Sequence, residues 1–143
     1  MNNTVYNGAY GFYMKEGTAT VKNNIIKNVS TAAICHGCGS GSPSSLSVTY
    51  DYNLYDDGGS QTKIGLWAGV GTLNFNNWKK QCNCDSHSLN VDPLLVNPPS
   101  DLHLQSSSPA RGAGENGVDI GAYSYSSSIQ IPQTPGNLQV VVQ

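Results

Sequence analysis

The sequence is poor in charge. Asp, Glu, Lys and Arg make up 11% of its 143 residues, and the formal net charge is −2. A helical bundle needs more Glu and Lys than this, and binding to nucleic acid or an anionic membrane needs a surplus of positive charge. Long apolar runs are missing too, since none approaches the roughly 20 residues of a membrane-spanning helix. We therefore expect a β-rich domain with no nucleic-acid partner and no membrane span.

A signal peptide is also missing. Residues 1–5 have neither the basic region nor the apolar stretch that a secretion signal contains. Because the chain opens in the middle of a strand pattern, we interpret Met1 as the start of a fragment of a longer protein.

What the chain has in abundance is Gly, Ser and Asn, which favour turns between short strands. A weak repeat runs through its first half. Residues 3–7, 24–28 and 53–57 each begin with Asn and continue with strand-forming residues, and the second and third follow at offsets of 21 and 29 residues. Such periods predict a solenoid of stacked strands, in which Asn side chains at equivalent positions bond to one another.

The second half is predicted to contain one short helix. Residues 73–80 place Phe75 and Trp78 on one helical face, and Asn74 is a suitable N-cap. The stretch that follows at residues 92–99 cannot form a regular central strand, because Pro93, Pro98 and Pro99 lack a backbone donor.

Six segments of this half together form a recognisable pattern. They read LNFNNW (73–78), DSHS (85–88), DPLLVNP (92–98), DLHL (101–104), SPARGAG (108–114) and DIGAY (119–123). In this order and spacing they resemble the closing segment of secreted right-handed parallel β-helix proteins of the pectate-lyase-like group. The resemblance implies an all-β, right-handed parallel β-helix fragment with a C-terminal cap over residues 1–125, and an extracellular or cell-surface setting.

The resemblance also implies a structural role for the polar residues of these segments. The residues that match are Trp78, Asp85, His87, Asp92, Asp101, His103, Arg111 and Asp119. Asp side chains among turns bond to backbone donors, and a lone Arg ties loops together. We expect Arg111, the only Arg, to form a bridge to Asp119 or Asp101.

Residues 126–143 differ from the rest. A Ser- and Pro-rich linker leads into PGNLQV at residues 135–140, which resembles the entry into a fibronectin type III module. We interpret this segment as a linker followed by the first strand of a truncated module.

The four cysteines form two pairs in the sequence, Cys35 with Cys38 and Cys82 with Cys84. Three arrangements are open. A disulfide between the two regions suits an extracellular protein, a zinc site uses all four thiolates, and free or partly oxidised thiols are the third arrangement.

The candidate catalytic residues are Asp51, Asp56, Asp57 and Lys63. Chemistry on a glycan needs two carboxyl groups beside the bond, or a base beside a group that neutralises a sugar carboxylate. Asp56 and Asp57 are adjacent and point to opposite sides of an extended chain, so they are not a ready pair. A turn into Gly58 explains them better, and their oxygens could also serve calcium.

Tyrosines recur beside these carboxylates. Tyr50 and Tyr52 alternate along a strand and are expected on one side of it, with Tyr55 nearby. Exposed tyrosine rings suit the stacking of sugar rings, whereas buried ones fill the core.

Two functions follow from these observations. The first is the C-terminal part of an extracellular protein that binds or processes polysaccharide, by lyase or glycosidase chemistry if it is an enzyme, with an incomplete catalytic set in this chain. The second is a non-catalytic surface adhesin or self-assembling solenoid. A β-helix cut before residue 3 would expose strand edges at its N-terminal end, so we also expect a homo-oligomer formed through that end.

Overall fold

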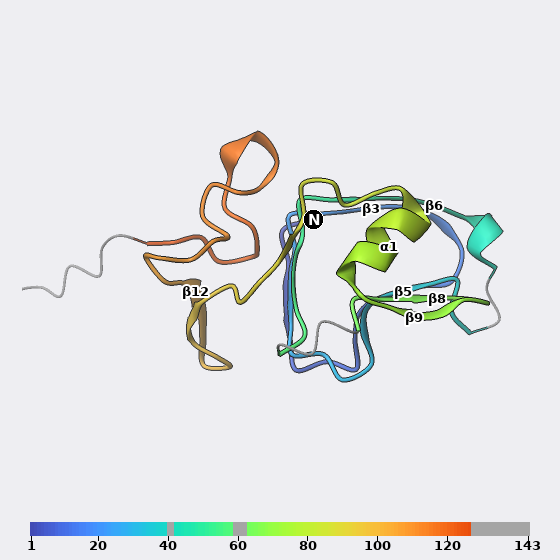
Figure 1. Cartoon of the computed structure of the whole chain (residues 1–143). Helices are drawn as coiled ribbons and strands as arrows, with labels where there is room; N and C mark the ends of the chain where they lie inside the picture. The colour runs from blue at the N-terminus through green and yellow to red at the C-terminus, as the bar shows by residue number, and fades with distance from the viewer. Residues whose placement is uncertain (40–41, 59–62, 127–143) are drawn as a thin grey trace, which may run out of the picture.

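The computed structural model describes residues 1–39, 42–58 and 63–126, and Figure 1 shows the arrangement of its strands and helix. Residues 127–143, which hold nearly all of the predicted linker and truncated module, lie outside the described residues.

The first sheet joins the three repeated segments. Its order is β1 (Thr4–Tyr6), β4 (Ile25–Lys27), β7 (Leu54–Asp56) and β10 (Leu89–Asn90), and all neighbours are parallel. Thr4 pairs with Ile25, Ile25 with Leu54, and Leu54 with Leu89. The predicted offsets of 21 and 29 residues are therefore confirmed as strand register.

An amide row accompanies this sheet. The side-chain Nδ2 of Asn3 donates to Oδ1 of Asn24 over 3.0 Å, and Nδ2 of Asn24 donates to Oδ1 of Asn53 over 2.9 Å. Asn24 and Asn53 are fully buried, so the row supplies hydrogen-bond partners to polar groups that solvent cannot reach. The predicted bonding between equivalent Asn side chains is confirmed.

Two further sheets face each other (Figure 1). One contains β3 (Gly17–Lys22) and β6 (Leu46–Asp51), which follows the 3₁₀ turn η1 (Pro43–Ser45). The other has the order β2 (Tyr10–Met14), β5 (Ala32–His36), β8 (Gly65–Trp67) and β9 (Gly71–Leu73). The last of these strands, β9, runs antiparallel to β8.

Helix α1 (Phe75–Cys82) lies across the space between these two sheets in Figure 1. It begins at Asn74, whose side chain accepts the backbone N–H of Asn77 over 2.9 Å, as predicted. It ends at Asn83 in a left-handed conformation, a common way to terminate a helix. Trp78 is completely buried and covers Gly65, where a Cβ would lie 2.0 Å from its ring.

The first sheet is buried on both faces. Ile26 and Tyr55 face a core that includes Trp78, while Ile25 and Leu54 belong to a second core. The second core is completed by the C-terminal part of the chain, with β11 (Leu95–Asn97) antiparallel to β12 (Asp101–Leu104), and then the 3₁₀ turn η2 (Glu115–Gly117). Its buried members from this part are Leu95, Leu104, Ala110 and Ile120.

The prediction of a right-handed parallel β-helix is wrong. The described residues form a small β-rich domain of four separate sheets with parallel and antiparallel pairing, and none of these sheets closes. The chain turns back at Gly69, whose φ of +81° suits glycine, so β9 runs antiparallel to β8 instead of starting another stacked strand. Pro93, Pro98 and Pro99 then prevent further parallel pairing, and the chain folds onto the outer side of the first sheet.

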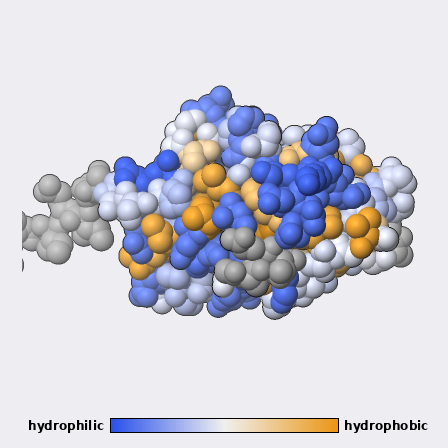
Figure 2. All heavy atoms as spheres, in the orientation of Figure 1, coloured by the Kyte–Doolittle hydropathy of each residue, from blue (hydrophilic) through white to orange (hydrophobic). Residues whose placement is uncertain are grey.

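One face of the molecule shows a mixed surface (Figure 2). On the face drawn in Figure 2, hydrophobic residues form small separate patches among hydrophilic ones. No helix among the described residues is long and apolar enough to cross a membrane.

Candidate functional site

A buried carboxylate lies where α1 meets the first sheet. Asp85 is 1% exposed and accepts hydrogen bonds from Trp78 Nε1 at 2.7 Å, Tyr55 Oη at 3.0 Å and Asn53 Nδ2 at 3.2 Å. The hydroxyl of Ser88 donates to it as well. Four donors from three parts of the chain thus converge on one side chain, as expected of a structural residue.

Burial has the largest effect on the pKa of Asp85. It raises the pKa of Asp85, although the hydrogen bonds from Ser88, Trp78, Asn53 and Tyr55 act in the opposite direction. Burial also raises the pKa of Tyr55, and the nearby Asp85 carboxylate raises it further. Because both side chains are buried and already bonded to one another, neither is placed to exchange protons with a substrate.

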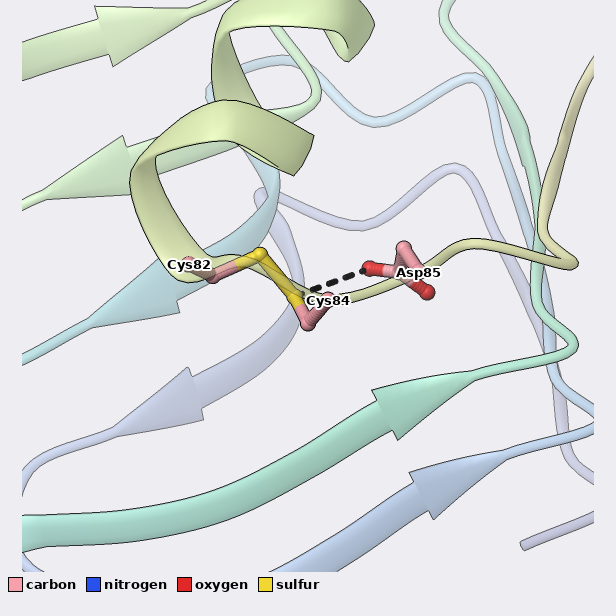
Figure 3. A group of neighbouring side chains, drawn as sticks. All are labelled: Cys82, Cys84 and Asp85. Carbon is pink, nitrogen blue, oxygen red and sulfur yellow. Dashed lines mark hydrogen bonds between the residues drawn. A yellow bond between two sulfur atoms is a disulfide. The ribbon is translucent and has the colours of Figure 1, made fainter.

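Two cysteines lie directly beside Asp85 (Figure 3). Cys82 and Cys84 form a disulfide, and Sγ of Cys84 lies 3.8 Å from Oδ2 of Asp85. One possible ligand atom from each of these three residues lies within 4.8 Å of the others. The group could hold a metal ion, but only after reduction of the disulfide, since thiolates are the ligands.

The other disulfide joins Cys35 to Cys38. The predicted disulfide between the two regions is therefore wrong, and so is a zinc site that uses all four thiolates. Local backbone explains the pairing: Gly37 has a φ of +74° and Asn83 a φ of +50°, and these left-handed residues turn each pair of cysteines together. The Cα atoms lie 5.8 Å apart in the first pair and 5.1 Å apart in the second.

A flat aromatic pair lies on the surface next to this group. The rings of Tyr52 and His87 stack with centroids 4.6 Å apart and an angle of 7° between their planes. Nδ1 of His87 lies 2.8 Å from Oδ2 of Asp51, and its backbone N–H donates to the other carboxylate oxygen at 2.8 Å. The side chain of His87 is 58% exposed and Tyr52 is half-buried, so the stack is held in place with its His87 ring open to solvent.

Electrostatics fix the charge of Asp51. Burial alone would raise its pKa, but the hydrogen bonds from the side chain and backbone of His87 and from the backbone of Tyr52 outweigh burial and hold the pKa below its usual value. Asp51 therefore stays ionised at neutral pH, which suits a hydrogen-bond acceptor and not a proton donor.

A cleft of about 330 Å³ lies beside the Tyr52–His87 stack, because its lining residues Asp51 and Ser86 directly precede Tyr52 and His87 in the chain. We call it the disulfide cleft, because Cys82 and Cys84 form part of its wall. Its polar lining includes Lys22, Thr49, Asp51, Asn83 and Ser86. Nζ of Lys22 lies 2.6 Å from a carboxylate oxygen of Glu115 and 5.9 Å from the centroid of the Tyr52 ring.

A second cleft, of about 440 Å³, lies at the carboxyl ends of β4, β7 and β10. We call it the carboxylate cleft. Lys27 contacts both Asp56 and Asp92 there, the latter at 3.0 Å, and Asp57 also lines it. Burial would raise the pKa of Asp92, but the backbone N–H of Leu94 and the ammonium of Lys27 lower it.

The structure does not join the predicted catalytic residues into one site. Asp51 contacts His87, whereas Asp56 contacts Lys27. The ammonium of Lys63 donates to the backbone oxygen of Ser30 at 3.2 Å, and its backbone N–H donates to Asp57 at 3.4 Å. Lys27 pairs with Asp56, and the loop that would supply further oxygen ligands to calcium includes residues outside the described ranges, so the calcium site stays a prediction.

The tyrosines divide in a way that corrects their predicted role. Tyr50 and Tyr55 are buried, so they cannot stack on a sugar ring, and only Tyr52 of the three predicted glycan-binding tyrosines reaches the surface. Tyr50 donates to or accepts from Nδ1 of His36 at 2.9 Å inside the core.

The C-terminal polar residues bond locally. Nδ1 of His103 lies 2.8 Å from Asp101, and Asp119 accepts the backbone N–H groups of Gly112 and Tyr125. Arg111 donates to the backbone oxygen of Ser106 and lies 4.0 Å from the Tyr125 ring centroid. The expected bridge from Arg111 to Asp119 or Asp101 is wrong, since within the described ranges no ion pair joins them.

The structure gives two residues, Lys22 and His36, contacts that were not expected from the sequence. Lys22 reaches Glu115 across 93 residues, a contact that no local pattern signals. His36 is buried in a stack with Trp67, with ring centroids 4.0 Å apart, and burial lowers its pKa. Its place between two cysteines in the sequence was the only signal of its importance.

Comparison of the chain with protein-family models, with curated proteins and with solved structures gives no match in any of the three.

Proposed function

We propose that the protein is a non-catalytic, extracellular polysaccharide-binding domain whose contact surface is the Tyr52–His87 stack and the adjoining disulfide cleft. The observation that carries the proposal is the stack itself: the Tyr52 and His87 rings lie in nearly parallel planes, Asp51 holds His87 in place, and the His87 side chain is open to solvent. A rigid aromatic surface beside hydroxyl, amide and carboxylate groups is suited to a sugar ring, which has an apolar face and a polar rim.

The carboxylates argue for binding and not for catalysis. Glycoside hydrolysis needs a proton donor with a raised pKa close to the bond. Asp85 has a raised pKa but is buried, whereas Asp51 and Asp92, which line the clefts, have lowered pKa values. The two disulfides suit the oxidising extracellular setting.

The test is binding of a polysaccharide panel by affinity electrophoresis, followed by calorimetry on any ligand found. We expect retention by at least one polysaccharide, and a roughly three- to tenfold loss of affinity in Tyr52→Ala, from the usual worth of an aromatic contact. Tyr123→Ala removes an exposed tyrosine elsewhere and is the matched control.

Product assays on the same panel test the absence of catalysis. We expect neither unsaturated products nor new reducing ends. Unchanged affinity in a folded Tyr52→Ala variant would contradict the proposed surface, and product formation would contradict the non-catalytic assignment.

We also propose a second, redox-dependent function: after reduction, Cys82 and Cys84 bind Zn²⁺ with Asp85 as the third ligand. The support is the proximity of the three ligand atoms and the lack of any cation at ion-pair distance from buried Asp85 within the described ranges. Cys82 and Cys84 also line the disulfide cleft, so a fourth ligand could enter from solvent.

Cadmium is a suitable probe, because its thiolate complexes absorb in the ultraviolet. Reduced Cys35→Ser/Cys38→Ser protein should keep a band that Cys82→Ser/Cys84→Ser protein loses. No band in the first variant would contradict the metal site.

A further inference from the structure

We infer that the ligand of the Tyr52–His87 stack is a neutral polysaccharide and not a uronic-acid polymer. The inference deepens the proposed binding function and rests on it. It follows from how the positive charges near the stack are used, and it names the chemical class of the sugar.

Among its described lining residues, the disulfide cleft offers no unpaired cation. Lys22 is its only lysine or arginine, and the ammonium is already held by Glu115 at 2.6 Å. Asp51 adds a second carboxylate, which accepts the backbone N–H of His87 and contacts its ring nitrogen. Two carboxylates therefore face one ammonium, and a sugar carboxylate would meet repulsion at this surface.

The only arginine is also engaged elsewhere. Recognition of a carboxylate usually relies on the two-pronged contact that a guanidinium makes. Arg111 donates to the backbone oxygen of Ser106 and packs on the Tyr125 ring, and it does not line the disulfide cleft.

The carboxylate cleft repeats this pattern. Its one lysine, Lys27, lies between Asp56 and Asp92, and Asp57 also lines the cleft. A uronic-acid polymer that avoided the first cleft would therefore find no better charge in the second.

The polar groups around the stack suit hydroxyls instead. Carboxylate oxygens accept hydrogen bonds, and the side chains of Thr49, Asn83 and Ser86 both donate and accept. A neutral sugar can place its C–H face on the exposed ring and its hydroxyls against these groups with no charge left unpaired.

The experiment measures binding to neutral and acidic polysaccharides side by side. The neutral set is glucan, xylan, mannan and galactan, and the acidic set is polygalacturonate, alginate and hyaluronan. We expect retention on at least one neutral polymer, about tenfold or more tighter than on any acidic one, little affected by salt and weakened by Tyr52→Ala.

A charge variant gives a second readout. Glu115→Gln releases Lys22, so the variant should gain salt-sensitive binding to an acidic polymer. Asp101→Asn removes one negative charge at an exposed site outside both clefts, and it should gain nothing.

The outcomes separate the two proposals. Retention on acidic polymers alone overturns the neutral class and leaves the binding function standing. Failure to bind any polymer, with the fold intact, overturns the binding function and the class with it.

Discussion

Trp78 donates its indole N–H to the carboxylate of Asp85 over 2.7 Å, and this bond ties α1 to the chain that follows it. Both side chains are buried, and Asp85 receives three more donors in the same place. The bond therefore belongs to a network whose members depend on one acceptor.

Replacing that acceptor should be costly. Asp85→Asn keeps the size of the side chain and tolerates the φ of +54°, but it turns one oxygen into a donor that faces other donors. We expect a loss of about 2–4 kcal/mol in the free energy of unfolding, measured by urea denaturation. Asp101→Asn, at an exposed site, should lose less than about 0.5 kcal/mol; equal losses in both variants would contradict the network.

The contact between Gly65 and Trp78 leaves no room for a methyl group. Gly65→Ala would place a Cβ 2.0 Å from the indole ring, and we expect a loss of roughly 1–3 kcal/mol or failure to fold. Trp78→Phe has its own cost, but in combination with Gly65→Ala the two losses should be less than additive. Strict additivity in thermal or urea unfolding would show that the two residues do not press on each other.

The amide row predicts a gradient of stability. Asn53 is buried and bonds to Asn24, to the backbone of Val21 and to Asp85, whereas Asn3 is exposed and bonds mainly to Asn24. We expect Asn53→Ala to lose about 2–4 kcal/mol and Asn3→Ala at most about 1 kcal/mol. Urea unfolding of both variants checks this, and a larger loss for Asn3→Ala would reverse the argument.

The two disulfides should differ in their response to reductant. Cys35 and Cys38 are buried, whereas Cys82 and Cys84 are partly exposed and line a cleft. A mild reductant under native conditions should therefore open the Cys82–Cys84 bond first. Alkylation and peptide mass mapping over a reductant series would detect this order, and labelling of Cys35 before Cys82 would contradict it.

The pairing of Asp51 with His87 makes part of the stability dependent on pH. The pKa of Asp51 is lowered in the folded protein, so the folded state binds its proton less tightly than the unfolded state. The contribution is present above the unfolded value near pH 4 and is lost as the pH falls through the lower folded value. Because the pair is solvent-exposed, we expect less than about 1 kcal/mol.

Asp51→Asn supplies the measurement for this last prediction. The difference in unfolding free energy between the parent protein and the variant should be largest near neutral pH and shrink below pH 4. A difference that stays constant down to pH 2 would mean that the ion pair does not contribute.

Local sequence patterns predicted the features that depend on residues close together in the chain. The Asn-led segments gave the register between β1, β4 and β7, and the spacing of Phe75 and Trp78 with the Asn74 cap gave α1 to within two residues. Whether the sheets closed was beyond such patterns, because it depended on a turn at Gly69 and on packing between Ile25 and residues some 70 or more positions later, such as Leu95.

Side-chain direction shows the same limit within the candidate site. Alternation along a strand placed Tyr50 and Tyr52 on one side, but β6 ends at Asp51 and Tyr52 has a φ of +54°. That one left-handed residue turns Tyr52 outwards while Tyr50 stays in the core. Backbone conformation at a single corner therefore decides which tyrosine can meet a ligand, and residue spacing does not encode it.

The burial of the first sheet on both faces sets a limit for anyone who shortens this chain. Residues 93–126 look like an appendage in Figure 1, yet they supply Leu95, Leu104, Ala110 and Ile120 to the core around Ile25 and Leu54. A stop codon after Asp92 would leave these two side chains facing water on an open sheet. The truncated protein would expose part of its core and tend to aggregate, and it would not form a smaller stable domain. An expressed fragment or fusion protein therefore has to include the chain at least through Ile120.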